Sequence, residues 1–186
     1  MTTEKIEATI NKLQELGYYK FVPEGAIDQA KENTRKALAK NILVSDYDYD
    51  KFAPEKHILA SLDRRLYAAD AETLAEQGVK ELLENMQDVL EKEGVNLGQI
   101  EENFNISGSY TIDINGEQFV IYSKEEEKNG EIWSLATKRT LELVNKLLEQ
   151  AGSQERLYGI SGGNDGQVIF LTPEIYEYTK SLNLTV

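Results

Sequence analysis

Apolar residues repeat at helical spacing in the first 40 residues of the chain. The first set of these positions is Ile6, Ile10, Leu13 and Leu16. A repeat of three or four residues predicts a helix, and Gly17 provides a carboxy-terminal stop. A second helix is predicted from about Pro23 to Lys40, with a thin apolar face of alanine, isoleucine and leucine. We expect the two helices to form a helical hairpin over residues 1–41.

The clearest helical pattern begins at Asp70, a predicted N-cap, and ends at Gly94. Its apolar stripe consists of Leu74, Val79, Leu82, Leu83, Met86, Val89 and Leu90. We predict one helix whose stripe faces the core, while its acidic residues face water or a partner. A similar stripe predicts a helix that starts at Trp133 and ends before Gly152, and Pro173 is expected to open a short final helix.

Alternating apolar and polar residues predict two hairpins in the second half of the chain. The predicted strands are Ser109–Ile114, Glu117–Tyr122, Leu157–Ile160 and Val168–Leu171. Asn115 and Gly116 separate the first two strands and are typical of a type I′ turn, in which both central residues need positive φ. The segment 161–166 suits the turn of the second hairpin, and residues 125–130 are expected to form a loop.

These elements predict an α+β fold. Two hairpins would form an antiparallel sheet of about four strands, and helices would cover one of its faces. The length of 186 residues suits a single domain, in which residues 1–41 are a helical segment appended to an α+β core over residues 58–186. Residues 42–56 are expected to be irregular or to hold a short strand, and 57–66 to hold a short helix or strand.

Charge is distributed unevenly along the chain. The sequence has 33 acidic and 20 basic residues, for a formal net charge of −13. The segment from Asp70 to Glu102 contains ten acidic residues against Lys80 and Lys92, so it carries −8 of that charge. Such a field repels phosphate backbones and anionic lipids, so we expect neither nucleic-acid nor membrane binding. It favours a basic protein partner, although the acidity also has a simpler interpretation, which is that it keeps the domain soluble.

Features that the sequence lacks exclude several kinds of catalytic site, metal site and targeting segment. There is no cysteine, which excludes disulfides, thiolate nucleophiles and cysteine-ligated metals. The first residues include charged ones, and no apolar run of about 18 residues occurs, so neither a signal peptide nor a membrane helix is predicted. We therefore expect a cytoplasmic protein without a cofactor.

The most distinctive local motif is the alternating run Asp46, Tyr47, Asp48, Tyr49 and Asp50. Its carboxylates resemble the start of a calcium-binding loop, but Lys51 and His57 occupy the positions where such a loop needs glycine and a bidentate glutamate. In an extended chain, the three aspartates would lie on one face and the two tyrosines on the other. The aspartates would then form an acidic rim for a basic partner, with the tyrosines as anchors. A solvated loop without a specific role is the alternative.

Other candidate motifs lack a required partner. His57 is the only histidine, and neither a cysteine nor a Gly-x-Ser-x-Gly elbow accompanies it. The segment Ser161–Gly166 lacks the Lys-Ser/Thr ending of a phosphate-binding loop. The two tight basic pairs, at 64–65 and 138–139, lack the aromatic and basic neighbours of a nucleic-acid surface. No catalytic, cofactor-binding or metal-ligating residue is therefore predicted.

We expect a protein-binding module rather than an enzyme. In its most specific form, the hypothesis is an immunity or inhibitor protein that neutralises a basic bacterial toxin through complementary charge. The predicted partner-binding residues are Asp46, Tyr47, Asp48, Tyr49, Asp50, Glu81, Glu84 and Asp88. Two alternatives stay open. One is an enzyme or small-ligand-binding protein whose carboxylates and tyrosines form a site only in the folded chain, and the other is an adaptor subunit of a larger complex.

Overall fold

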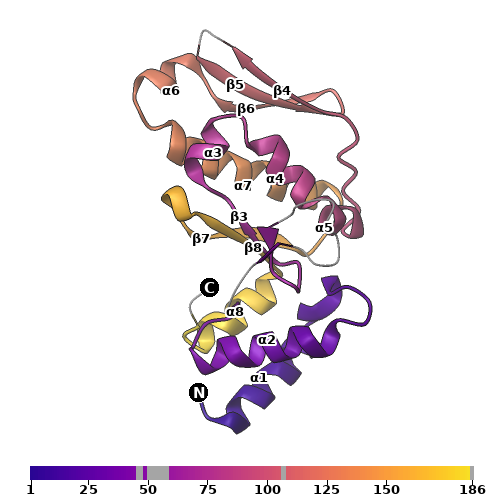
Figure 1. The fold of residues 1–186 in the computed structure, drawn as a ribbon. Helices are drawn as coiled ribbons and strands as arrows, with labels where there is room; N and C mark the ends of the chain where they lie inside the picture. The colour runs from indigo at the N-terminus through magenta and orange to yellow at the C-terminus, as the bar shows by residue number, and fades with distance from the viewer. Residues whose placement is uncertain (45–47, 50–58, 106–107, 185–186) are drawn as a thin grey trace. The chain divides into compact units, whose positions relative to one another are not determined.

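The chain divides into two compact units. The computed structural model describes residues 1–44, 48–49, 59–105 and 108–184 (Figure 1). The first unit contains Met1–Tyr67 and Ile169–Val186, and the second contains Ala68–Val168. The chain passes between the units within two strands, β3 (Leu66–Ala68) and β8 (Gln167–Leu171). The predicted single-domain organisation is not tested by this division and stays a prediction.

Helices at both ends of the chain belong to the first unit. They are α1 (Thr3–Glu15), the 3-10 helix η1 (Tyr18–Phe21), α2 (Ile27–Ala39) and α8 (Pro173–Ser181). The side chain of Thr2 caps α1 by accepting a hydrogen bond from the Lys5 backbone N–H. The two amino-terminal helices contact each other, in agreement with the predicted helical hairpin (Figure 1). The second begins four residues later than expected, because the chain first turns at Gly25, whose φ is 77°.

The strands of the first unit are short. They are β1 (Asp48–Tyr49), β2 (Leu59–Ala60), β3 and β8, in the order β1-β2-β3-β8. Strands β1 and β3 each pair with β2 in antiparallel orientation. The backbone N–H of Phe170 in β8 donates to the Arg65 carbonyl beside β3, over 2.9 Å. Within the undecided region 57–66, the structure therefore places a strand at residues 59–60, and a second strand begins at Leu66.

Five helices of the described chain lie in the second unit. They are α3 (Ala71–Ala75), α4 (Val79–Asn85), α5 (Gln87–Lys92), α6 (Lys124–Lys128) and α7 (Ile132–Gln150). The prediction of one helix from Asp70 to Gly94 is wrong, because the chain turns at Gln77, whose φ is 69°. Gly78 follows at a close approach, since a Cβ there would lie 2.6 Å from the Thr73 carbonyl oxygen. The apolar stripe is buried as predicted, but three short helices carry it.

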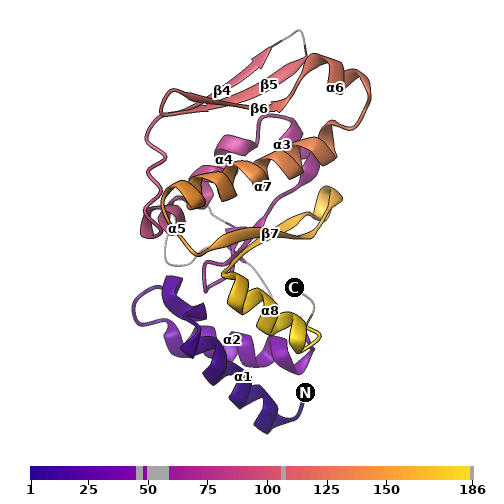
Figure 2. The ribbon, with the colours of Figure 1, turned by 180° about the vertical axis from the view of Figure 1, so that it is seen from behind.

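The sheet of the second unit is antiparallel and three-stranded. Its strands, in spatial order, are β4 (Ile100–Asn105), β5 (Ser109–Ile114) and β6 (Glu117–Tyr122). The turn at Asn115 and Gly116, with φ of 54° and 84°, confirms the predicted hairpin. A bulge opposite Tyr110 and Thr111 turns both Ile121 and Tyr122 inward, so β6 does not alternate to its end. Helices α3, α4 and α7 lie along one side of this sheet (Figures 1 and 2).

The α+β class is confirmed, but the predicted sheet of two hairpins is wrong. The hairpin of β5 and β6 pairs with β4, a strand that the sequence did not indicate. The neighbour of β8 in the second unit is β7 (Arg156–Ser161), and these two strands do not join that sheet. The short 3-10 helix η3 (Gly163–Asp165) lies between them, where a turn was expected.

Candidate protein-binding surface

The negative charge of the chain belongs almost entirely to the second unit. Residues 68–168 contain twenty acidic and eight basic residues, which gives a net charge of −12. The residues of the first unit, thirteen acidic and twelve basic, leave only −1. The acidic segment recognised in the sequence is therefore part of a larger acidic unit, which produces a negative potential over its own surface.

Three of the predicted partner-binding residues lie on α4 and α5. Glu81 and Glu84 are exposed on α4, and Asp88 is half-buried on α5. The spacing of three residues between Glu81 and Glu84 places them on one side of α4, whereas Asp88 belongs to the next helix. Lys80 pairs with Glu84 over 3.8 Å between Nζ and Oε1, and the two side chains are 40% and 53% exposed. Glu81 and Glu84 thus lie exposed one turn apart on α4, and we call this side of the helix the α4 face.

Side chains of the sheet fix the amino-terminal end of α4. Gly78 is the N-cap and has no side chain with which to cap the helix. In its place, the Tyr110 hydroxyl accepts from the Val79 backbone N–H over 3.3 Å. The Glu102 carboxylate accepts from the Lys80 N–H over 3.0 Å and also from the Tyr110 hydroxyl. A carboxylate at this end interacts favourably with the helix dipole, so the helix that carries the α4 face is anchored at its first turn.

Tyr110 stays protonated in this arrangement. Burial and, second, its hydrogen bond to the Glu102 carboxylate raise the pKa of Tyr110 well above the ordinary value. The hydroxyl therefore remains a donor to Glu102 near neutral pH, and its oxygen remains an acceptor for the helix N–H. Neither residue was singled out by the sequence, although Tyr110 was placed in a predicted strand.

The second group of predicted partner-binding residues belongs to the part of the sequence that forms the first unit. Asp46, Tyr47 and Asp50 lie outside the described residues, as does His57. Asp48 and Tyr49 form β1 of the first unit, where they pair with Ala60 and Leu59 of β2. The extended backbone at these two positions agrees with the extended alternative. The role of this run in partner binding stays a prediction.

An exposed tryptophan lies at the start of α7. The sequence pattern placed Trp133 on the apolar stripe of that helix, but its side chain is 43% exposed. The neighbouring Glu131 is exposed as well, and Glu125 is exposed on α6. Tryptophan is enriched at the energetic centres of protein interfaces, so an exposed one near carboxylates is typical of a binding surface.

The expected loop at residues 125–130 is wrong, because residues 124–128 form α6. Ser123 and Glu126 form a capping box, in which each side chain bonds the backbone N–H of the other. The Ser-x-x-Glu spacing was a readable signal for this helix start. Arg139 of α7 binds the same carboxylate through two nitrogens, at 2.7 and 2.9 Å. The hydrogen bonds from Arg139 and then from Ser123 lower the pKa of Glu126 to about 2.

An open groove of about 310 Å³ lies in the second unit. Its lining residues are Gly94, Val95, Asn96, Ile114, Asn115, Glu117, Leu147, Gln150 and Ala151. They come from three places, which are the residues after α5, the turn between β5 and β6, and the last turn of α7. Lys146 also reaches this region, since its Nζ lies 2.6 Å from Oε1 of Glu117.

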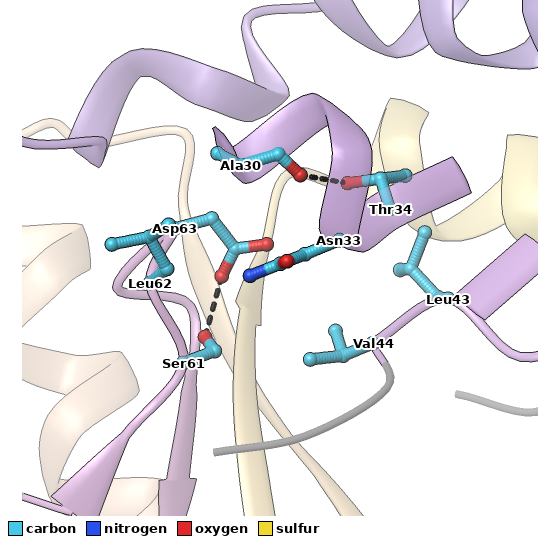
Figure 3. A pocket seen from close by; sticks show the side chains of 8 residues that line it. All are labelled: Ala30, Asn33, Thr34, Leu43, Val44, Ser61, Leu62 and Asp63. Carbon is cyan, nitrogen blue, oxygen red and sulfur yellow. Dashed lines mark hydrogen bonds between the residues drawn. The ribbon is translucent and has the colours of Figure 1, made fainter. Parts of the chain in front are cut away.

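A smaller polar pocket in the first unit has room for about one water molecule, with a volume of about 10 Å³ (Figure 3). Asn33 and Thr34 reach it from α2, and Ser61 and Asp63 from the turn between β2 and β3. The Ser61 hydroxyl donates to the Asp63 carboxylate over 2.5 Å and accepts from the Leu66 N–H. These bonds shape the turn, and the pocket is too small for a metabolite.

Within residues 1–44, 48–49, 59–105 and 108–184, no three His, Cys, Asp or Glu residues are grouped so that they could hold a metal ion. No helix among those residues is both long and apolar enough to cross a membrane. No family model, curated protein or solved structure matches this chain.

Proposed function

We propose that this chain is an acidic protein-binding module that neutralises a basic protein, with a bacterial toxin domain as the partner. The observation that carries the proposal is the net charge of −12 on residues 68–168, against −1 on the rest of the chain. An excess of negative charge needed only for solubility has no reason to be concentrated in one unit. A field confined in this way suits recognition of a surface of opposite charge.

The proposed partner follows from the chemistry of charge complementarity. Toxins that cleave nucleic acid present positive surfaces to phosphate backbones. An inhibitor with the opposite field is steered toward such a surface and is repelled by acidic competitors. The α4 face supports this role, because Glu81 and Glu84 are exposed on a helix that the sheet holds at its first turn. The chain then acts as an immunity protein.

The test uses the protein encoded beside the gene for this chain. That protein is produced together with the chain, and the association rate of the purified pair is measured at several salt concentrations. We expect the rate to fall as salt rises. The double variant Glu81→Lys/Glu84→Lys should slow association by about tenfold, because it reverses two charges of the steering field. Glu15→Lys/Glu24→Lys, which reverses two exposed acids of the first unit, is the matched control.

Two results would contradict the proposal. The first is that the neighbouring protein is not basic and neither binds the chain nor impairs growth in its absence. The second is association that does not change with salt, since steering by charge must weaken as the Debye length shortens. If the control variant slows association as much as the α4 variant does, the steering is not specific to the α4 face.

A further inference from the structure

The ends of two helices meet at the groove of the second unit. Helix α7 is 19 residues long and ends at Gln150, and α5 ends at Lys92. A Cβ built on Gly94 would lie 3.8 Å from the Cβ of Ala151, so the residues after α5 touch the end of α7. Helix carboxy-termini carry partial negative charge. Two of them therefore add their negative potential at the same place.

Few positive charges offset this potential. The last turn of α7 contains no basic residue, whereas α5 has Lys92 in its last turn. Glu117 is the one charged residue among the described residues that line the groove. Lys146 binds that carboxylate over 2.6 Å, but each of the two side chains is about half exposed. The pair is thus accessible to water and open to exchange with another cation.

The walls of the groove suit a long side chain with a charged tip. Val95 and Ile114 are buried core residues whose surfaces reach the lining, and Leu147 is half-buried beside them. Such walls pack against methylene groups, as the stems of arginine and lysine require. Gln150 is another of the lining residues, and its side-chain amide oxygen can accept a hydrogen bond.

We infer that the groove binds an arginine side chain, which under the proposed function belongs to the basic partner. A guanidinium presents several N–H donors in one plane, so it can bind Glu117 and the Gln150 amide together. Lysine offers one compact ammonium in place of this planar fork. In the free protein, Lys146 competes with the incoming side chain for Glu117 and limits its affinity.

The competition by Lys146 gives the experiment two variants with opposite expected effects. Acetyl-arginine amide is titrated into isotope-labelled protein without any partner, and amide NMR shifts are followed at Gly94, Asn96 and Gln150. Glu117→Gln should abolish the shifts. Lys146→Gln should tighten binding by about two- to fivefold, because an exposed ion pair of this kind is worth up to about 1 kcal/mol. Lys138→Gln, on an exposed face of the same helix, should change nothing.

A neutral analogue decides whether charge is what the groove recognises. Acetyl-citrulline amide has nearly the same shape as the arginine probe and no positive charge, so it should produce no shifts. Equal shifts with both probes, no shifts with either, or no effect of Lys146→Gln would overturn the inference. These results leave the proposed function intact if the partner still binds through the α4 face. A partner that fails to bind overturns the proposed function, whereas the probe alone decides the groove.

Discussion

Arg65 is a basic residue in the interior of the first unit. It is fully buried, and its guanidinium donates to the carbonyl oxygens of Tyr18, Phe170 and Gly17 over 2.5, 2.7 and 3.1 Å. It also lies 4.8 Å from the ring centre of Phe21. The sequence showed only a basic pair at positions 64–65. Its acceptors are 47 or more residues away along the chain, so no local pattern indicated the burial.

Replacement of Arg65 tests whether it holds the first unit together. Arg65→Met should lower the free energy of unfolding by about 3–5 kcal/mol, because buried carbonyls lose their donors at about 1–3 kcal/mol each. Arg65→Lys should lose less, since it keeps a donor but not the planar fork. Urea unfolding followed by far-UV circular dichroism measures both. Lys36→Met, on the exposed side of α2, is the control. If Arg65→Met lowers the free energy of unfolding no more than this control does, Arg65 does not hold the first unit together.

Glu126 predicts a dependence of stability on pH. Its pKa is lowered from the ordinary 4.5 to about 2 in the folded chain, so folding favours the ionised form. The resulting stabilisation is complete above about pH 4.5 and is lost as the pH falls toward 2. Glu126→Gln should therefore be less stable than the wild type at pH 7, with a difference that shrinks between these values. Urea midpoints from Trp133 fluorescence measure it, and a constant difference would contradict the assignment.

The exposed neighbour Glu125 provides the matched control for this pH profile. It lies in the first turn of α6, as Glu126 does, but no hydrogen bond to its side chain is described. Glu125→Gln should therefore follow the wild-type profile. A profile of Glu125→Gln that matches the one for Glu126→Gln would indicate general charge reduction on α6 instead of the Arg139 pair.

At the scale of elements, the break between α3 and α4 sets the direction in which the α4 face points. Gln77 and Gly78 make the break. Gly78 has a φ of −94°, which any residue can adopt, so glycine is needed there only because a side chain has no space. A Cβ there would meet both the side chain and the carbonyl of Thr73 at 2.6 Å. The Thr73 carbonyl oxygen belongs to α3, so it cannot move away without unwinding the end of that helix.

Gly78→Ala should consequently destabilise the second unit by about 1–3 kcal/mol, the usual cost of forcing extra volume into a packed site. Gly162→Ala is the control, because no atom lies within 4 Å of a Cβ at that position and its φ is −116°. Trp133 fluorescence during urea unfolding reports on the unit. Equal midpoints for the two variants would mean that α3 and α4 yield freely at this position.

The sequence predicted elements whose signals are local. The Asn115 and Gly116 turn and the apolar stripe of residues 74–90 each combine residue type with a fixed spacing, and both were found. Strand β4 was missed because its residues 101–103 are two glutamates and an asparagine, which do not alternate. The sheet order failed for a different reason, since hairpin signals give neighbours within a hairpin and not between hairpins.

In the candidate site too, only the features that depend on local sequence spacing were predictable. Glu81 and Glu84 were predictable as an outward face, because the helix period separates them from the buried leucines. The groove was not, because its lining residues come from three segments, around positions 95, 115 and 150. Only the fold brings these segments together.

At the scale of the whole molecule, the uneven charge predicts how salt affects stability. Twelve excess negative charges repel one another within the second unit. Salt at about 0.15 M in place of about 0.01 M shortens the Debye length from about 30 to about 8 Å and screens that repulsion. The urea midpoint from Trp133 fluorescence should therefore rise with salt. The double variant Glu81→Gln/Glu84→Gln should show a smaller rise. A fall with salt would mean that the ion pairs outweigh the repulsion.

The two strands in which the chain passes between units also have a consequence for synthesis on the ribosome. The second unit is one continuous stretch, residues 68–168, whereas the first unit needs residues from both ends of the chain. Arg65 emerges 105 residues before Phe170, whose carbonyl oxygen accepts one of its buried hydrogen bonds. At 5–20 residues per second, this delay is about 5–20 s. The acidic unit is therefore fully synthesised first. The first unit, which contains α1 and α2, can fold completely only after residues 169–186 have been synthesised.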